Sequence, residues 1–97
     1  MAEAIQLAET GDEGMVQCEV LGCQFYLDLF DATFRFRKLA IENENDEHAL
    51  WEAAKQLLVQ LGGPSASIHT VMRFWSRVTK AAEELKKNTA EFTETNS

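Results

Sequence analysis

Apolar and polar side chains alternate along residues 15–28, as they do in half-buried β-strands. Two such runs flank Leu21-Gly22, and alternating runs around a glycine-containing turn are typical of a β-hairpin. A two-residue turn places Val20 opposite Cys23 and Cys18 opposite Phe25. One face of the hairpin is then wholly apolar, formed by Val16, Cys18, Val20, Cys23, Phe25 and Leu27.

The period becomes helical at Asp28, a predicted N-cap. In the helix that follows, Phe30, Phe34 and Ile41 form one apolar stripe. A second stripe lies beside it, formed by Leu29, Ala32, Phe36, Leu39 and Ala40. A helix with so wide an apolar arc packs on more than one side. We therefore expect it between the hairpin and the other helices, with part of its surface reserved for a partner.

Two more helices follow in the pattern. Asn45 or Asp46 caps the first of them, and Gly62-Gly63-Pro64 ends it. Ser65 or Ser67 caps the other, whose core-facing stripe is Ile68, Val71, Met72, Trp75, Val78, Ala82 and Leu85. The predicted fold class is α+β, with an N-terminal β-hairpin packed on a three-helix bundle and disordered termini.

The same pattern sets the predicted boundaries. Residues 1–14 are expected to be a flexible acidic arm, in which Ile5 and Leu7 allow a short additional strand. Residues 15–88 form a single α+β domain. Beyond it the apolar pattern is lost, so residues 89–97 are predicted to be a disordered tail.

The charge distribution restricts the class of partner. The net charge is −7, and no Lys or Arg precedes Arg35. A free-standing nucleic-acid binder should be basic, so we expect no direct nucleic-acid binding. No secretion signal or apolar run of about 20 residues is visible, which predicts a cytoplasmic protein that does not enter a membrane.

Catalytic and metal-binding patterns are missing from the sequence. Cys18 and Cys23 lie diagonally in the predicted hairpin, too far apart for an unstrained disulfide. A zinc site would need their C-x4-C spacing and the distant His48 and His69, so we expect no metal and no cofactor. No nucleophile elbow or phosphate-binding loop occurs, and we predict that the protein is not an enzyme.

Four residues are candidates for binding a protein partner: Tyr26, Phe34, Phe36 and Arg37. Tyr26 lies on the outer face of the hairpin, where an aromatic side chain can anchor an interface. Arg37 falls inside the apolar arc of its helix. The alternative to a role in binding is that the side chain extends its charged end into water. The basic stripe Arg73, Arg77 and Lys80 is either an ion-pairing surface or a solvated helix face.

The string "VLGCQFYLDLFDATFRFRKLA", followed by "ALWEAAKQLLVQLGGPSASIHTVMRFWSRVTKAAEELKK", resembles the small tail assembly chaperones of phages and prophages. The resemblance covers residues 16–87. It implies a non-enzymatic, acidic binder in the bacterial host cell, whose partner is the tape measure protein or the tail tube protein. Such a chaperone coats the tape measure protein before the tail tube polymerises. It has no catalytic residues to carry over.

Other functions remain open at this point. The main alternative is an acidic, phage-type inhibitor or decoy that mimics nucleic acid and blocks a host nucleic-acid-binding protein. A structural or toxin-neutralising module is a third. A chaperone for a long helix needs an exposed apolar strip, expected here with an acidic rim, and its contact should tolerate salt better than that of a decoy. Without its partner, the same surface should drive homo-oligomerisation.

Overall fold

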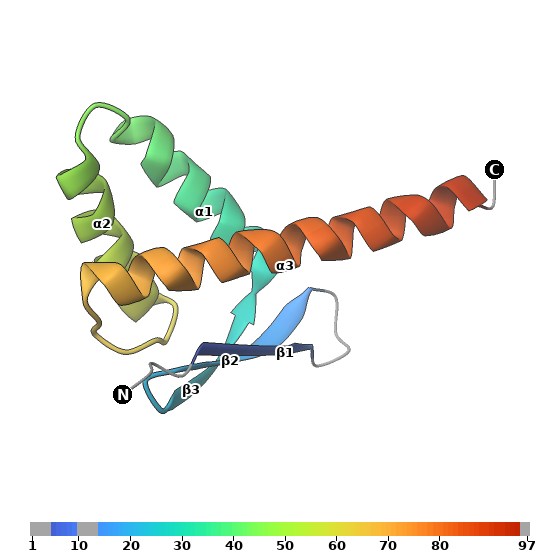
Figure 1. Cartoon of the computed structure of the whole chain (residues 1–97), viewed down its shortest axis with the longest axis horizontal. Coiled ribbons are helices and arrows are strands. Elements are labelled where there is room, and N and C mark those ends of the chain that lie inside the picture. The colour runs from blue at the N-terminus through green and yellow to red at the C-terminus, as the bar shows by residue number, and fades with distance from the viewer. Residues whose placement is uncertain (1–4, 10–13, 96–97) are drawn as a thin grey trace.

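The computed structural model describes residues 5–9 and 14–95, which form a three-stranded sheet and three helices (Figure 1). The α+β fold class is therefore confirmed. The predictions made for residues 1–4, 10–13 and 96–97 lie outside the described residues.

Strands β2 (Met15–Val20) and β3 (Cys23–Asp28) form the predicted hairpin. Val20 pairs with Cys23 and Cys18 with Phe25, which confirms the register. The turn has φ of 52° at Leu21 and 83° at Gly22. Two positive φ values match the twist of a two-residue hairpin turn, at the cost of a left-handed conformation for Leu21. The apolar row on the two strands is strong enough to determine the register in spite of that leucine.

Strand β1 (Ile5–Glu9) adds to the other edge of β2, so the sheet order is β1-β2-β3 and all pairs are antiparallel. Ile5 pairs with Val20 and Leu7 with Cys18, which continues the apolar row on the inner face. The short strand left open at Ile5 and Leu7 is thus present, and residues 5–9 are not a flexible arm. Burial of Ile5, which is 8% exposed, supplies the physical reason.

The three helices are α1 (Leu29–Glu42), α2 (Glu47–Gln60) and α3 (Ile68–Thr95). The carboxylate of Asp28 caps α1 by accepting from the backbone N–H groups of residues 30 and 31 at 2.9 and 3.0 Å. Asp46 caps α2 by accepting from the N–H of residue 49 at 3.0 Å. Ser67 Oγ accepts from the N–H of residue 70 at 3.2 Å at the start of α3. All three caps are among those predicted from the sequence.

Helix α3 continues to Thr95, past Lys87, where the apolar pattern ends. The predicted domain boundary at residue 88 therefore falls within a helix. In Figure 1 the C-terminal part of α3 extends beyond the sheet and the other helices, which explains why no apolar periodicity is needed there.

The core lies between the inner face of the sheet and the helices. Helix α3 contributes its largest side chains, Phe74 and Trp75, which are 0% and 1% exposed. Phe74 packs against Phe25 of β3, with the ring centres 6.1 Å apart. The predicted stripe of α3 omitted Phe74 and included Met72, which is 40% exposed. Val71, Trp75, Val78 and Ala82 are buried as predicted. The buried arc also takes in Phe74 and leaves out Met72, because α3 packs against the sheet as well as against α1 and α2.

Both cysteines are free, with Cys18 buried and Cys23 half-buried. We expect a thiol titration of unfolded, unreduced protein to count two thiols per chain, and metal analysis to find no stoichiometric zinc. In the folded protein Cys23 should react first, because burial raises the pKa of the Cys18 thiol from 9.0 to about 12. Equal reaction rates in the folded state would contradict the buried position of Cys18.

The raised pKa of Cys18 also links stability to pH. The folded protein keeps this thiol protonated, whereas the unfolded chain ionises it above pH 9.0. The contribution of Cys18 to the free energy of unfolding is therefore complete below pH 9.0 and is lost as the pH rises toward about 12. A Cys18→Ala variant should lack this part of the alkaline destabilisation.

Candidate functional site

An exposed stripe runs along one side of α1. Its apolar members are Phe30, Phe34 and Ile41, with exposed fractions of 46%, 69% and 72%. Spacings of four and seven residues place them on one side of the helix, as predicted, and Arg37 lies among them. We call Phe30, Phe34, Arg37 and Ile41 the α1 stripe.

Gly14 supports the first residue of this stripe. Its carbonyl oxygen accepts a hydrogen bond from Leu29 N–H at 3.0 Å, which holds the start of β2 against the start of α1. A Cβ atom at Gly14 would lie 2.8 Å from the Phe30 ring. The glycine, with φ of 81°, thus lets the backbone approach an aromatic ring that remains half exposed.

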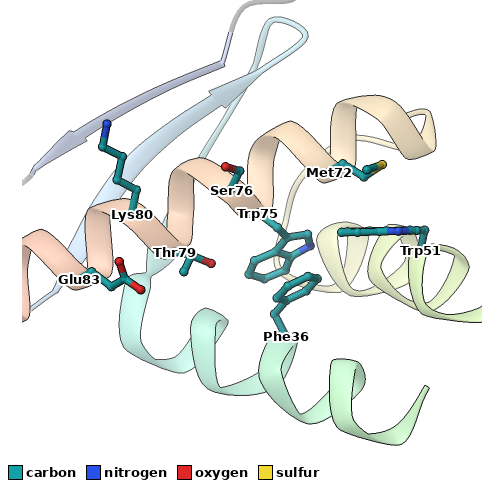
Figure 2. Close-up of a pocket in the computed structure, with 8 residues that line it drawn as sticks. All are labelled: Phe36, Trp51, Met72, Trp75, Ser76, Thr79, Lys80 and Glu83. Carbon is teal, nitrogen blue, oxygen red and sulfur yellow. The ribbon is translucent and has the colours of Figure 1, made fainter. Parts of the chain in front are cut away.

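A cavity of about 320 Å³ opens where the three helices meet (Figure 2). Phe36 of α1 stacks on Trp75 of α3, with ring centres 4.6 Å apart and planes 15° apart. Trp51 of α2 continues the row, 5.7 Å from Phe36. The walls are completed by α3 residues Met72, Ser76, Thr79, Lys80 and Glu83. Three aromatic rings from three helices therefore form one face of this cavity.

A second cavity, of about 150 Å³, lies between α1 and the C-terminal half of α3. It is lined by Phe30, Thr33, Phe34, Arg37, Ala82, Glu83 and Lys86. Glu83 lines both cavities, so the two adjoin. We call the two together the helix groove. Along α3 it extends from Met72 to Lys86, which corresponds to about 21 Å at the rise of an α-helix.

Three buried polar atoms along the helix groove lack a hydrogen-bond partner within the described residues: Thr33 Oγ1, Trp51 Nε1 and Trp75 Nε1. A buried polar group without a hydrogen-bond partner lowers the free energy of unfolding by about 1–3 kcal/mol. Two of the three are indole N–H groups, which act only as donors, and the hydroxyl can also donate. Each of the three atoms is enclosed by surrounding protein atoms, so none of them is open to a partner in the groove.

The charged residues at the groove are mostly basic, although the chain as a whole is acidic. Its ionisable lining residues are Arg37, Lys80, Lys86 and Glu83, whereas the whole chain has a net charge of −7. None of the three cations forms an ion pair within the described part of the chain. An acidic rim was expected around a partner-binding strip, but mostly basic residues line this groove. The reason is that the charged residues of the groove come from α1 and α3 and not from the acidic first third of the chain.

The structure brings together three of the four predicted binding residues. Phe34 and Arg37 are exposed and line the second cavity, and the exposure of Arg37 agrees with a side chain extended into water. Phe36 lines the first cavity but is half-buried in its stack on Trp75. Tyr26, 63% exposed, lies on the outer face of the sheet opposite Gln17 and lines neither cavity.

Several groove residues were not among the predicted binding residues. Phe30 had a signal, since it shares a stripe with Phe34. Thr33, Trp51 and Trp75 had none, because helical periodicity does not show which residues of a helix border a cavity between helices.

The chain matches no protein-family model, no curated protein and no solved structure. Within the described residues, no helix is sufficiently long and apolar to cross a membrane. Nor do three or more His, Cys, Asp or Glu side chains gather as metal ligands in the part of the chain that the structure describes.

Proposed function

We propose that the protein is a non-enzymatic protein-binding module whose α1 stripe and helix groove hold a partner. The observation that carries this proposal is the exposure of Phe34, at 69%, beside Phe30 and an arginine without an ion pair among the described residues. Aromatic and arginine side chains are enriched at the energetic centres of protein interfaces. Contiguous exposed apolar residues on a small protein are typical of interaction surfaces.

Within this class, we propose a phage tail assembly chaperone that acts in the cytoplasm of the bacterial host and binds the tape measure protein. The resemblance over residues 16–87 supports this choice. An elongated groove with aromatic walls also suits a helical partner, which binds through a row of apolar anchors. In the absence of the partner, the α1 stripe should mediate self-association.

Coexpression tests the proposal. The protein should keep the tape measure protein of the same phage soluble, and Phe34→Asp or Arg37→Glu should abolish this effect without unfolding the domain. Both side chains are exposed, so neither change disturbs the core. Matched controls are Val59→Asp, at an exposed apolar position of α2, and Arg77→Glu, at an exposed basic position of α3 that lines neither cavity. Both controls should retain activity.

Phe36→Asp is a poor probe, since it places a carboxylate in the stack with Trp75 and is expected to unfold the protein. The tail-chaperone proposal is contradicted if the wild-type protein does not solubilise any tail protein. Binding to a basic nucleic-acid-binding protein that is lost by about 0.5 M salt would instead support the acidic decoy.

A further inference from the structure

We infer that the helix groove binds an amphipathic α-helix that carries acidic side chains beside its apolar anchors. This inference rests on the proposed function and specifies the chemistry of the partner.

The shape of the groove indicates a helix. It follows α3 for about 21 Å, whereas anchors at positions i, i+4, i+7 and i+11 of a helix span about 17 Å. A small molecule that filled the larger cavity would leave the second one, with Phe34 and Arg37, without a contact. A helix of about four turns reaches both cavities.

The lining of the groove indicates where apolar anchors lie. Phe36, Trp51 and Trp75 form a continuous aromatic wall in the larger cavity, and Met72 stands at its rim (Figure 2). Thioether side chains adapt to varied apolar surfaces. In the smaller cavity Phe30 and Phe34 supply a second apolar contact. Two separated aromatic patches fit a partner with apolar residues on successive turns.

The polar groups of the groove indicate acidic flanks. Arg37, Lys80 and Lys86 outnumber Glu83, and none of these cations is paired within the described residues. Carboxylates on the partner suit these cations, because they form charge-assisted hydrogen bonds with Lys and Arg side chains. The expected preference is opposite to the one that the net charge of −7 would impose on a nonspecific contact.

Three labelled peptides of about 18 residues test the inference. They share apolar anchors at i, i+4, i+7 and i+11 and differ in their flanking residues: glutamates, lysines, or glutamates with a central proline that breaks the helix. The glutamate peptide should bind the full chain at least about tenfold more tightly than either of the others, measured by fluorescence anisotropy. It should also change the tryptophan emission, since Trp51 and Trp75 are the only tryptophans of the chain and both line the groove.

Charge-reversal variants locate the contact. Lys80→Glu and Lys86→Glu should each weaken binding of the glutamate peptide by about fivefold or more, whereas Arg77→Glu should change it by less than about twofold. All three side chains are exposed on α3, and only Arg77 lines neither cavity. Equal losses in the three variants would mean that long-range charge, and not the groove, attracts the peptide.

Other results overturn the inference. Equal or tighter binding of the lysine peptide excludes acidic flanks, and equal binding of the proline peptide excludes a helix. Binding without a change in tryptophan emission places the peptide elsewhere. If wild-type protein self-associates and Lys80→Glu or Lys86→Glu makes it monomeric, the occupant is a second copy of the chain. Solubilisation of the tape measure protein with failure of the glutamate peptide removes this inference alone, while the reverse result removes the tail-chaperone proposal alone.

Discussion

Replacing Trp75 by alanine should lower the free energy of unfolding by about 3–5 kcal/mol, most of the stability of a domain this small. Trp75 is 1% exposed, stacks on Phe36 and meets Phe74 edge-on at 5.4 Å. Its removal leaves a cavity between α1 and α3 that the neighbouring rings cannot fill without leaving their own contacts. A chemical denaturation curve measures the loss.

Arg77→Ala is the matched control for this change. Arg77 is exposed on the same helix, two residues from Trp75, and its truncation should cost about 0.5 kcal/mol or less. Equal shifts of the two unfolding curves would mean that Trp75 is not central to the packing of α3. A Trp75→Ala variant that folds as stably as the wild type would have the same implication.

Replacing Gly63 by alanine should destabilise the protein by about 2–3 kcal/mol through overpacking. A Cβ atom at this position would clash with Leu58 Cδ1, and it would lie 2.9 Å from Leu58 Cγ and 3.1 Å from the Leu58 carbonyl oxygen. Leu58 is 0% exposed, so its side chain has no free space to enter. Gly63 cannot retreat easily either, because its N–H donates to that same carbonyl at 2.9 Å. Thermal or chemical unfolding reports the change.

Gly22→Ala separates this steric effect from backbone strain. Nothing lies within 4 Å of a Cβ atom at Gly22, but the residue has φ of 83°. The expected cost is therefore the left-handed conformation alone, about 1 kcal/mol. The structural interpretation of Gly63 is wrong if its alanine variant is no less stable than that of Gly22.

Local chemistry determined the elements of this fold. The alternation around Leu21-Gly22 predicted the hairpin and its register, because a shift by one residue would turn the whole apolar row toward water. The helix starts were predicted at Asp28, at Asn45 or Asp46, and at Ser65 or Ser67, since a cap acts on N–H groups only two or three residues away. The structure selects Asp46 and Ser67 from the two pairs. The outward stripe of α1 was also visible, because its members are separated by one or two helical turns.

The candidate site depended on the tertiary structure. Trp51 and Trp75 meet Phe36 only because α2 and α3 pack against α1, and periodicity within one helix does not show which neighbour each apolar face meets. For the same reason the sequence did not show that Phe74 is buried while Met72 is exposed, or that Tyr26 lies away from the groove. The sequence by itself determined the β2–β3 hairpin, the regions where the helices start and an excess of apolar surface on α1, and it left β1 open. Only the packing of α1 against α3 decided that Arg37 would border one groove with Lys80 and Lys86. The two helices are far apart along the chain and become neighbours through contacts that no local pattern encodes.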